Sequence, residues 1–172
     1  MPELAGRSLT FLLGGARSGK SAYAEKLATA LQSPWTYIAT AQAFDDEMRE
    51  RIALHRARRP KGWITRDASL GLAAAIHVEP GSPVLVDCLT LWLSNVMLAR
   101  HDMPAAMADL EEACAIAAGP LVLVSNEVGL GIVSDNELAR RFRDHAGLLH
   151  QRLAARADRV ILMVAGLPLT VK

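Results

Sequence analysis

The hydrophobic and polar positions of this chain fall into short apolar runs separated by longer amphipathic stretches. The apolar runs are nearly continuous, which is typical of strands in a parallel sheet with helices on both faces. The amphipathic stretches favour helices, because their apolar residues recur at a spacing of three or four. The predicted strands are Leu9–Leu13, Trp35–Ala39, Pro83–Cys88, Leu121–Ser125 and Arg159–Ala165, and the predicted helices cover residues 19–31, 45–58, 69–77, 89–100, 104–118 and 135–156.

Strands and helices alternate along the chain, and this order predicts an α/β fold with a mostly parallel, doubly wound sheet. Two smaller strands could extend it. Trp63–Arg66 could form an edge strand, and Leu169–Lys172 could form a terminal strand after a break at Gly166-Leu167-Pro168. The chain has no internal repeat and no linker, so residues 1–172 are expected to form a single domain.

The carboxyl ends of the predicted strands indicate where a ligand would bind. In open parallel sheets, ligands bind beyond these ends. The rule selects five segments of this chain, which are residues 14–21, 40–42, 87–90, 126–129 and the residues from Gly166 onward.

The first of these segments, Gly14 to Ser21, reads Gly-Gly-Ala-Arg-Ser-Gly-Lys-Ser and matches the phosphate-binding pattern G-x-x-x-x-G-K-[ST]. It lies between a predicted strand and a predicted helix, as the pattern requires. Its glycines permit close backbone approach, and its N–H groups form an anion nest at the start of a helix. Lys20 can reach the β- and γ-phosphates, and the Ser21 hydroxyl can bind Mg²⁺. We therefore expect a nucleoside triphosphate site here.

Composition and charge narrow the class of protein. The formal net charge is +1 and aromatic residues are 5%, so the sequence indicates neither a basic groove nor a stacking platform for nucleic acid. No apolar run reaches the roughly 18 residues of a membrane span, and the first apolar stretch runs into the phosphate loop, unlike a signal peptide. Cys88 and Cys114 lack metal-ligand spacing and suit reduced, buried thiols. A cytoplasmic protein is expected.

Two acidic residues follow predicted strands at the same edge of the sheet as the phosphate loop. Asp87 ends the run Val84-Leu85-Val86, which is the position of the acid that binds Mg²⁺ directly or through water in phosphate-loop enzymes. Glu127 follows the strand Leu121–Ser125. It could hold a metal-bound water, act as a base or cap the next helix, and the sequence leaves these roles open.

Cationic side chains surround one histidine near the end of the predicted helix 45–58. Arg51 lies four residues before His55, and Arg58 and Arg59 lie three and four residues after it, so all share one helix face. Nearby positive charge keeps an imidazole neutral and nucleophilic, and arginines bind phosphate oxygens in bidentate fashion. Such a site suits nucleotidyl transfer through a covalent histidine. The alternative is a solvated basic face.

Taken together, these segments resemble one family, the bifunctional adenosylcobinamide kinase / adenosylcobinamide-phosphate guanylyltransferases of cobalamin biosynthesis. The resemblance extends over essentially the whole chain. Besides the phosphate loop, it is carried by Tyr37–Ala41, Asp45–Met48, Arg51-Ile52, His55-Arg56, Trp63, Thr65, Val86–Thr90, Asn126–Val133, Arg140–Asp144, Gly147 and His150–Leu153.

The resemblance implies a fold, an activity and an assembly. The implied fold is the RecA-like three-layer sandwich of P-loop NTPases. Members of the family phosphorylate the aminopropanol hydroxyl of adenosylcobinamide with ATP or GTP. They then transfer GMP from GTP to the product through a GMP–histidine intermediate. The implied assembly is a homo-oligomer, a trimer, without a nucleic-acid or membrane partner.

The resemblance also implies roles for individual residues. His55 would carry the GMP, Lys20 would act on the phosphates, and Ser21 and Asp87 would hold Mg²⁺. Ser134 stands where the family pattern has proline, and Asp67 stands where glutamate is more familiar. The residues expected to contact the guanine nucleotide are Gly14, Gly15, Ala16, Arg17, Ser18, Gly19, Lys20, Ser21, Ala39, Thr40, Ala41, Arg56, Ala57, Arg58, Arg59, Asp67 and Asp87.

Three other functions compete with this interpretation. A small-molecule kinase with a single activity would use the phosphate loop and Asp87 but would not need His55. A GTP-binding switch is disfavoured, because the sequence has no Asn-Lys-x-Asp motif and no Asp-x-x-Gly at the strand that ends in Asp87. A nucleic-acid-dependent ATPase is disfavoured by the charge and the aromatic content.

Overall fold

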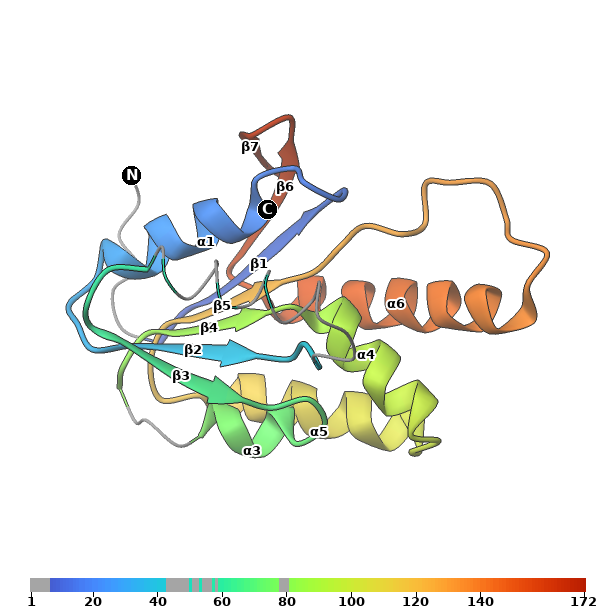
Figure 1. The fold of residues 1–172 in the computed structure, drawn as a ribbon, viewed down its shortest axis with the longest axis horizontal. Helices are drawn as coiled ribbons and strands as arrows, with labels where there is room; N and C mark the ends of the chain where they lie inside the picture. Colours follow the sequence, from blue (N-terminus) through green and yellow to red (C-terminus); the bar gives the residue numbers. More distant parts are fainter. Residues whose placement is uncertain (1–6, 43–49, 51–52, 54–56, 58, 78–80) are drawn as a thin grey trace.

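A computed structural model gives the fold of this chain. It describes residues 7–42, 50, 53, 57, 59–77 and 81–172. These residues build one seven-stranded sheet in the order β3-β2-β4-β5-β1-β6-β7 (Figure 1). The strands are β1 (Leu9–Gly14), β2 (Trp35–Ala39), β3 (Trp63–Asp67), β4 (Val84–Asp87), β5 (Leu121–Val124), β6 (Arg159–Val164) and β7 (Leu167–Thr170). The helices are α1 (Lys20–Thr29), α3 (Leu72–Ile76), α4 (Leu89–Leu98), α5 (Met103–Ile116) and α6 (Glu137–Arg156).

Neighbouring strands of this sheet run parallel, apart from the antiparallel pair of β6 and β7. Successive side chains of a strand point to opposite faces, and in the central strands β1, β4 and β5 both faces are buried. Phe11 belongs to the core on one face and Leu12 to the core on the other, and both are fully buried. This explains why the strands appear in the sequence as continuous apolar runs, and it confirms the predicted α/β fold with a mostly parallel sheet.

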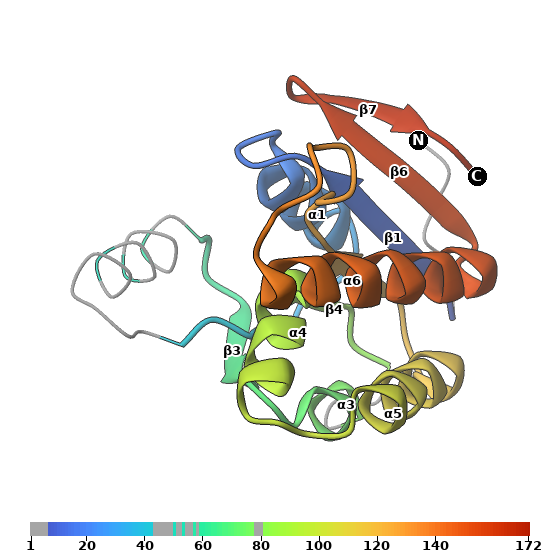
Figure 2. The ribbon, with the colours of Figure 1, turned by 90° about the vertical axis from the view of Figure 1, so that its right-hand side faces the viewer.

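The helices divide unequally between the two faces (Figures 1 and 2). Ala24 and Leu27 of α1 pack on one face against Leu85 and Val122. The other face carries the larger core, to which α3, α4, α5 and α6 contribute. The three layers predicted from the sequence are therefore present, with α1 facing the four helices across the sheet.

Side-chain caps and one glycine explain where three helices begin. Asp102 accepts a hydrogen bond from the Ala105 N–H at 2.9 Å and starts α5 at Met103, one residue before the predicted start at residue 104. Asn136 accepts from the Ala139 N–H at 3.0 Å and starts α6 at Glu137. The predicted helix 69–77 is shorter than expected, because α3 begins only after Gly71.

The chain returns after β6 through a tight hairpin. Ala165 and Gly166 form its turn with φ of 51° and 82°, which is the left-handed geometry that two-residue hairpins need. The predicted terminal strand therefore begins two residues earlier than expected, at Leu167. Pro168 lies inside β7 opposite Met163, and an edge strand tolerates a proline because one side of it needs no ladder hydrogen bond.

The predicted helix 45–58 lies largely outside the described residues. Its described members, Glu50, Ala53 and Ala57, are exposed and have helical geometry. Within the part of the chain that the structure describes, no helix is long and apolar enough to cross a membrane.

Candidate active site

The five strand-end segments selected from the sequence meet at one edge of the sheet. The Glu127 N–H donates to the Gly14 carbonyl at 2.9 Å, and the Gly166 N–H donates to the Ser18 carbonyl at 3.1 Å. On the other side of the sheet edge, the Thr40 hydroxyl donates to the Cys88 carbonyl at 2.7 Å. The Asn126 side-chain amide contacts the Thr90 hydroxyl at 3.2 Å. The phosphate loop is thus held within a continuous set of strand-end contacts.

Two glycines of the phosphate loop lie where a side chain would not fit. A Cβ atom at Gly14 would lie 2.6 Å from both the Met163 carbonyl oxygen and the Ser18 hydroxyl. Gly19 has a φ of 91°, and a Cβ atom there would lie 3.3 Å from the Gly166 Cα. The glycines of the motif therefore have a local physical reason, which is the close approach of β6 to Gly14 and of the β6–β7 turn to Gly19.

Lys20 is the buried cation of the site. It is 7% exposed, and its Nζ donates to the Gly15 carbonyl and, at 3.4 Å, to the Ser18 hydroxyl. Burial lowers the pKa of the Lys20 ammonium, while nearby Cys88 and Asp87 act in the opposite direction. Gly15, Ala16 and Arg17 are exposed around it, so the face of the loop is open to a ligand.

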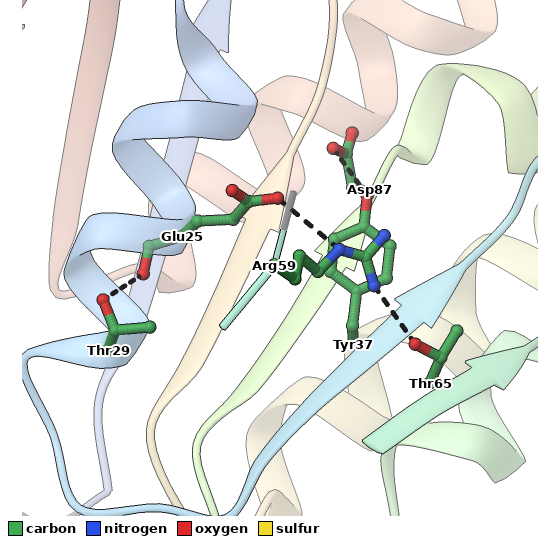
Figure 3. Close-up of polar contacts among 6 residues, drawn as sticks. All are labelled: Glu25, Thr29, Tyr37, Arg59, Thr65 and Asp87. Carbon is green, nitrogen blue, oxygen red and sulfur yellow. Dashed lines mark hydrogen bonds and ion pairs between the residues drawn. The ribbon is translucent and has the colours of Figure 1, made fainter. Parts of the chain in front are cut away.

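Asp87 lies at the end of β4, where its carboxylate is oriented by a tyrosine. The Tyr37 hydroxyl donates to Asp87 Oδ2 at 3.0 Å (Figure 3). Burial and the neighbouring Asp87 raise the pKa of Tyr37, so the phenol keeps the proton that it donates. Local sequence indicates only that Tyr37 lies in a strand, because its contact with Asp87 depends on the pairing of β2 with β4.

Arg59 contacts residues of three elements, which are β2, β3 and α1 (Figure 3). Its guanidinium lies 3.3 Å above the centre of the Tyr37 ring. Its Nη1 donates to the Thr65 hydroxyl at 3.1 Å, and its Nε lies 3.6 Å from Glu25 Oε1. Of the other residues predicted in this segment, Ala57 is exposed. His55, Arg56 and Arg58 lie outside the described residues, as do Arg51 and the acidic start of the segment.

The remaining predicted nucleotide contacts lie side by side at the ends of three strands. Ala39 of β2 is in register with Asp67 of β3 on one side and with Asp87 of β4 on the other. The Thr40 hydroxyl also accepts from the Cys88 N–H at 2.8 Å, and the Thr40 carbonyl accepts from Asn95 at 2.8 Å. The side chain of Thr40 therefore braces the edge of the site, and Ala41 follows it.

A buried histidine supports the segment that carries Glu127. His150 of α6 is 8% exposed, and its Nε2 lies 2.8 Å from the Ser125 hydroxyl. Burial lowers the pKa of His150, against a smaller opposite effect of Glu127. The Glu127 carboxylate accepts from the Gly129 N–H. It does not cap α6, because that role belongs to Asn136.

The oxygen atoms of Ser21 and Asp87 have the chemistry that Mg²⁺ prefers. Magnesium sites at phosphates use one or two protein oxygens, and water and phosphate complete the coordination. Within the described ranges, no group of three or more His, Cys, Asp or Glu residues is arranged to hold a metal. With one oxygen donor each, Ser21 and Asp87 fit a metal whose other ligands come from a nucleotide and water.

Comparison with known proteins identifies the family. Residues 10–171 match the family described as cobinamide kinase / cobinamide phosphate guanyltransferase. The bifunctional adenosylcobalamin biosynthesis protein CobP of Pseudomonas aeruginosa is 52% identical over 167 residues, which are 94% of this chain and 95% of the relative. CobU of Escherichia coli is 39% identical over 181 residues, with 95% of this chain and 99% of the relative covered.

The solved structures agree with this fold. The RadB recombinase aligns with a TM-score of 0.55 at 18% identity, over 92% of this chain and 75% of that one. This likeness shows the fold alone, and it confirms the expected RecA-like P-loop architecture. The family match and the high coverage of both relatives go further: the chain belongs to the cobinamide kinase / cobinamide phosphate guanyltransferase family and is a bifunctional enzyme of cobalamin biosynthesis.

Proposed function

We propose that one nucleotide pocket, built on the phosphate loop, serves both reactions of this enzyme. The observation that carries the proposal is the arrangement around Lys20, where the ends of β1, β2, β4, β5 and β6 meet. A second site of similar design would need another cradle of N–H groups with a buried cation. The residues Gly14–Ser21, Ala39–Ala41, Asp67 and Asp87 would line this single pocket.

In the kinase reaction, the pocket would hold ATP or GTP while the aminopropanol hydroxyl of adenosylcobinamide attacks the γ-phosphorus. The bond to the β-phosphate oxygen breaks, and adenosylcobinamide phosphate and a nucleoside diphosphate result. Lys20 and the loop N–H groups would stabilise charge on the phosphate oxygens, which is the main task of an enzyme in phosphoryl transfer.

In the guanylyltransferase reaction, His55 would attack the α-phosphorus of GTP, and pyrophosphate would leave. A phosphate oxygen of adenosylcobinamide phosphate would then attack the same phosphorus, and the phosphorus–nitrogen bond would break to release adenosylcobinamide-GDP. Covalent catalysis divides one transfer into two displacements. The position of Arg59 supports this assignment, because the residue four places after His55 lies against Tyr37, which contacts Asp87.

Ser21 and Asp87 would hold Mg²⁺ beside the phosphates. When bound, the metal would neutralise part of the negative charge on the phosphate oxygens. The Tyr37 hydroxyl would restrict the orientation of the Asp87 carboxylate, because the tyrosine is buried and keeps the proton that it donates.

We also propose that the enzyme assembles as a homo-oligomer, a trimer, of single-domain subunits in the cytoplasm. One feature of the surface supports the assembly. Leu167, Leu169 and Val171 on or beside β7 are 71%, 56% and 63% exposed. An edge strand with exposed apolar side chains favours association with another chain.

Labelling with α-³²P-GTP tests the covalent step. Wild-type enzyme and His55→Ala would be incubated with GTP and Mg²⁺, denatured and separated from free nucleotide. We expect acid-labile, alkali-stable label on the wild type and none on His55→Ala, while phosphorylation of adenosylcobinamide by ATP persists in both. A phosphoramidate has this pattern of stability.

His101→Ala is the matched control, because His101 is exposed and lies outside the site. It should label like the wild type. Label on His55→Ala at the wild-type level would place the intermediate elsewhere. If the wild type binds GTP but takes up no covalent label, only the kinase reaction would be assigned to this pocket.

A further inference from the structure

The loop between β5 and α6 presents apolar side chains to solvent. Leu130 is 89% exposed, Ile132 is 100% exposed and Val133 is 57% exposed. Figures 1 and 2 show this loop, in orange, projecting from the end of β5 beyond the sheet. Neighbouring apolar side chains that are this exposed usually mark a binding surface, because their contact with water is unfavourable.

The polar groups of the same loop determine its shape. The Glu127 carboxylate accepts from the Gly129 N–H at the start of the loop. At its end, Arg140 donates to the carbonyls of Ser134 and Asp135 at 3.0 and 2.6 Å, and Asn136 caps α6. These contacts anchor both ends of the loop, and its three apolar side chains are left pointing outward between them.

The loop starts beside the position of the transferred phosphate. The Glu127 N–H donates to the carbonyl of Gly14, the first residue of the phosphate loop. In the sheet, β5 lies between β1, which leads into the phosphate loop, and β4, which ends in Asp87. The lysine of such a loop and the metal-binding acid act on the terminal phosphates. The acceptor must therefore approach near the end of β5.

The acceptor of the kinase reaction has an unusual surface. Cobinamide consists of a broad corrin ring with largely apolar faces and a rim of amide side chains, and its reactive hydroxyl is at the end of a short arm. When that hydroxyl reaches the γ-phosphate, the ring remains outside the phosphate cradle. It then needs an apolar surface and accessible backbone groups, and the exposed Gly131 has no other group near its Cα to cover the backbone.

We infer that Leu130, Ile132 and Val133 form the docking surface for the corrin ring of the substrate. This inference rests on the proposed function, in which the kinase reaction takes place at the phosphate loop. The loop contacts the ring and takes no part in the chemistry, so it determines affinity for the corrinoid and leaves nucleotide binding unchanged.

Leu130→Ser and Ile132→Ser test the inference. Both side chains are almost fully exposed, so neither change should affect folding. Calorimetric titration with adenosylcobinamide should show about tenfold weaker binding for each variant, since an apolar side chain of this size contributes that much when it is buried. The KM for adenosylcobinamide should rise in parallel, while the Kd for GTP and the α-³²P-GTP label stay at wild-type values.

Leu98→Ser in α4 and Ile116→Ser in α5 are matched controls, because these side chains are 59% and 57% exposed and lie outside the loop. They should bind adenosylcobinamide like the wild type. Corrinoid affinity within twofold of the wild type in both loop variants would overturn the inference.

A second copy of this chain could occupy the same surface in place of the corrin ring. Sedimentation of the variants distinguishes these two occupants. A change in particle mass, with or without weaker corrinoid binding, would assign the loop to a subunit contact and overturn the inference. The proposed function fails on different grounds, namely when the wild type neither phosphorylates adenosylcobinamide nor takes up label. Direct titration of the corrinoid still tests the loop in that case.

Discussion

Two clusters of buried ionisable groups lie at opposite ends of the sheet, and their partners differ. At the amino end, the Glu111 side chain is 7% exposed and pairs with Arg152 and Arg156, whose side chains are 41% and 51% exposed. At the carboxyl end, Lys20 is equally buried, but its hydrogen bonds go to the neutral Gly15 carbonyl and Ser18 hydroxyl.

The difference separates a structural charge from one for which we propose a function. Glu111 of α5 is neutralised by two cations of α6, so the cluster joins two helices and needs no ligand. The pKa of Lys20 is lowered because burial disfavours its charged form. A bound phosphate would offset the free-energy cost of burying this charge. Perturbed, incompletely neutralised groups of this kind are typical of active sites.

The largest effect is expected at the carboxyl end. Lys20→Ala should lower kcat/KM of both reactions by about 1,000-fold, since it removes a preorganised cation from the phosphates. Stability should not fall, because the substitution removes a buried charge. Steady-state kinetics with each substrate would measure the loss, and Lys26→Ala, an exposed lysine on the same helix, is the control. Unchanged guanylyl transfer would show that the two reactions use separate pockets.

At the amino end, the expected effect is on stability. Glu111→Ala should lower the free energy of unfolding by roughly 2 kcal/mol, because it leaves two arginines without their buried partner. The half-exposed arginines keep this value below that of a fully buried pair. Urea unfolding measures it, and Glu112→Ala on the exposed side of α5 is the control. Loss of activity in folded Glu111→Ala would contradict a purely structural role.

A smaller, pH-dependent effect on stability is expected at His150. This residue belongs to α6 and lies between the two clusters. Its folded pKa is below the ordinary value of 6.5, so near that pH the unfolded chain binds a proton that the folded chain does not. The neutral His150 therefore contributes to stability above pH 6.5, and this contribution is lost as the pH falls from that value through the lower folded pKa.

Unfolding free energies of wild type and His150→Asn between pH 5 and 8 would reveal this contribution. The variant should lose less stability on acidification than the wild type. His101→Asn, at an exposed position, should follow the wild type. Parallel curves for wild type and His150→Asn would mean that the imidazole takes up its proton equally well in both states.

Much of the fold and part of the site could be predicted from the sequence. The strand ends that follow Leu13, Ala39 and Val86 were assigned to one edge of the sheet, and they lie there. Such predictions succeed because burial on both faces produces continuous apolar runs, and because the phosphate loop needs its glycines locally. The GMP-bearing histidine remains a prediction, since position 55 lies outside the described residues.

Other features of the site depend on contacts between distant residues. Tyr37 meets Asp87 because β2 and β4 are neighbours, and Arg59 covers the same ring from a segment that precedes β3. Ser125 meets His150 across the interface of the sheet with α6. Nothing in the local pattern of these residues distinguishes such pairs from ordinary strand and helix positions.

The sequence alone was sufficient for the phosphate loop, the alternation of strands and helices and the family, because each depends on local periodicity or on a short motif. The folded chain was needed for the neighbours of each strand. The order β4-β5-β1 places the end of β5 between Asp87 and the phosphate loop, and an apolar loop therefore starts on the side that we propose for the acceptor. Periodicity indicates whether a residue is buried, whereas long-range packing determines which residues that residue contacts.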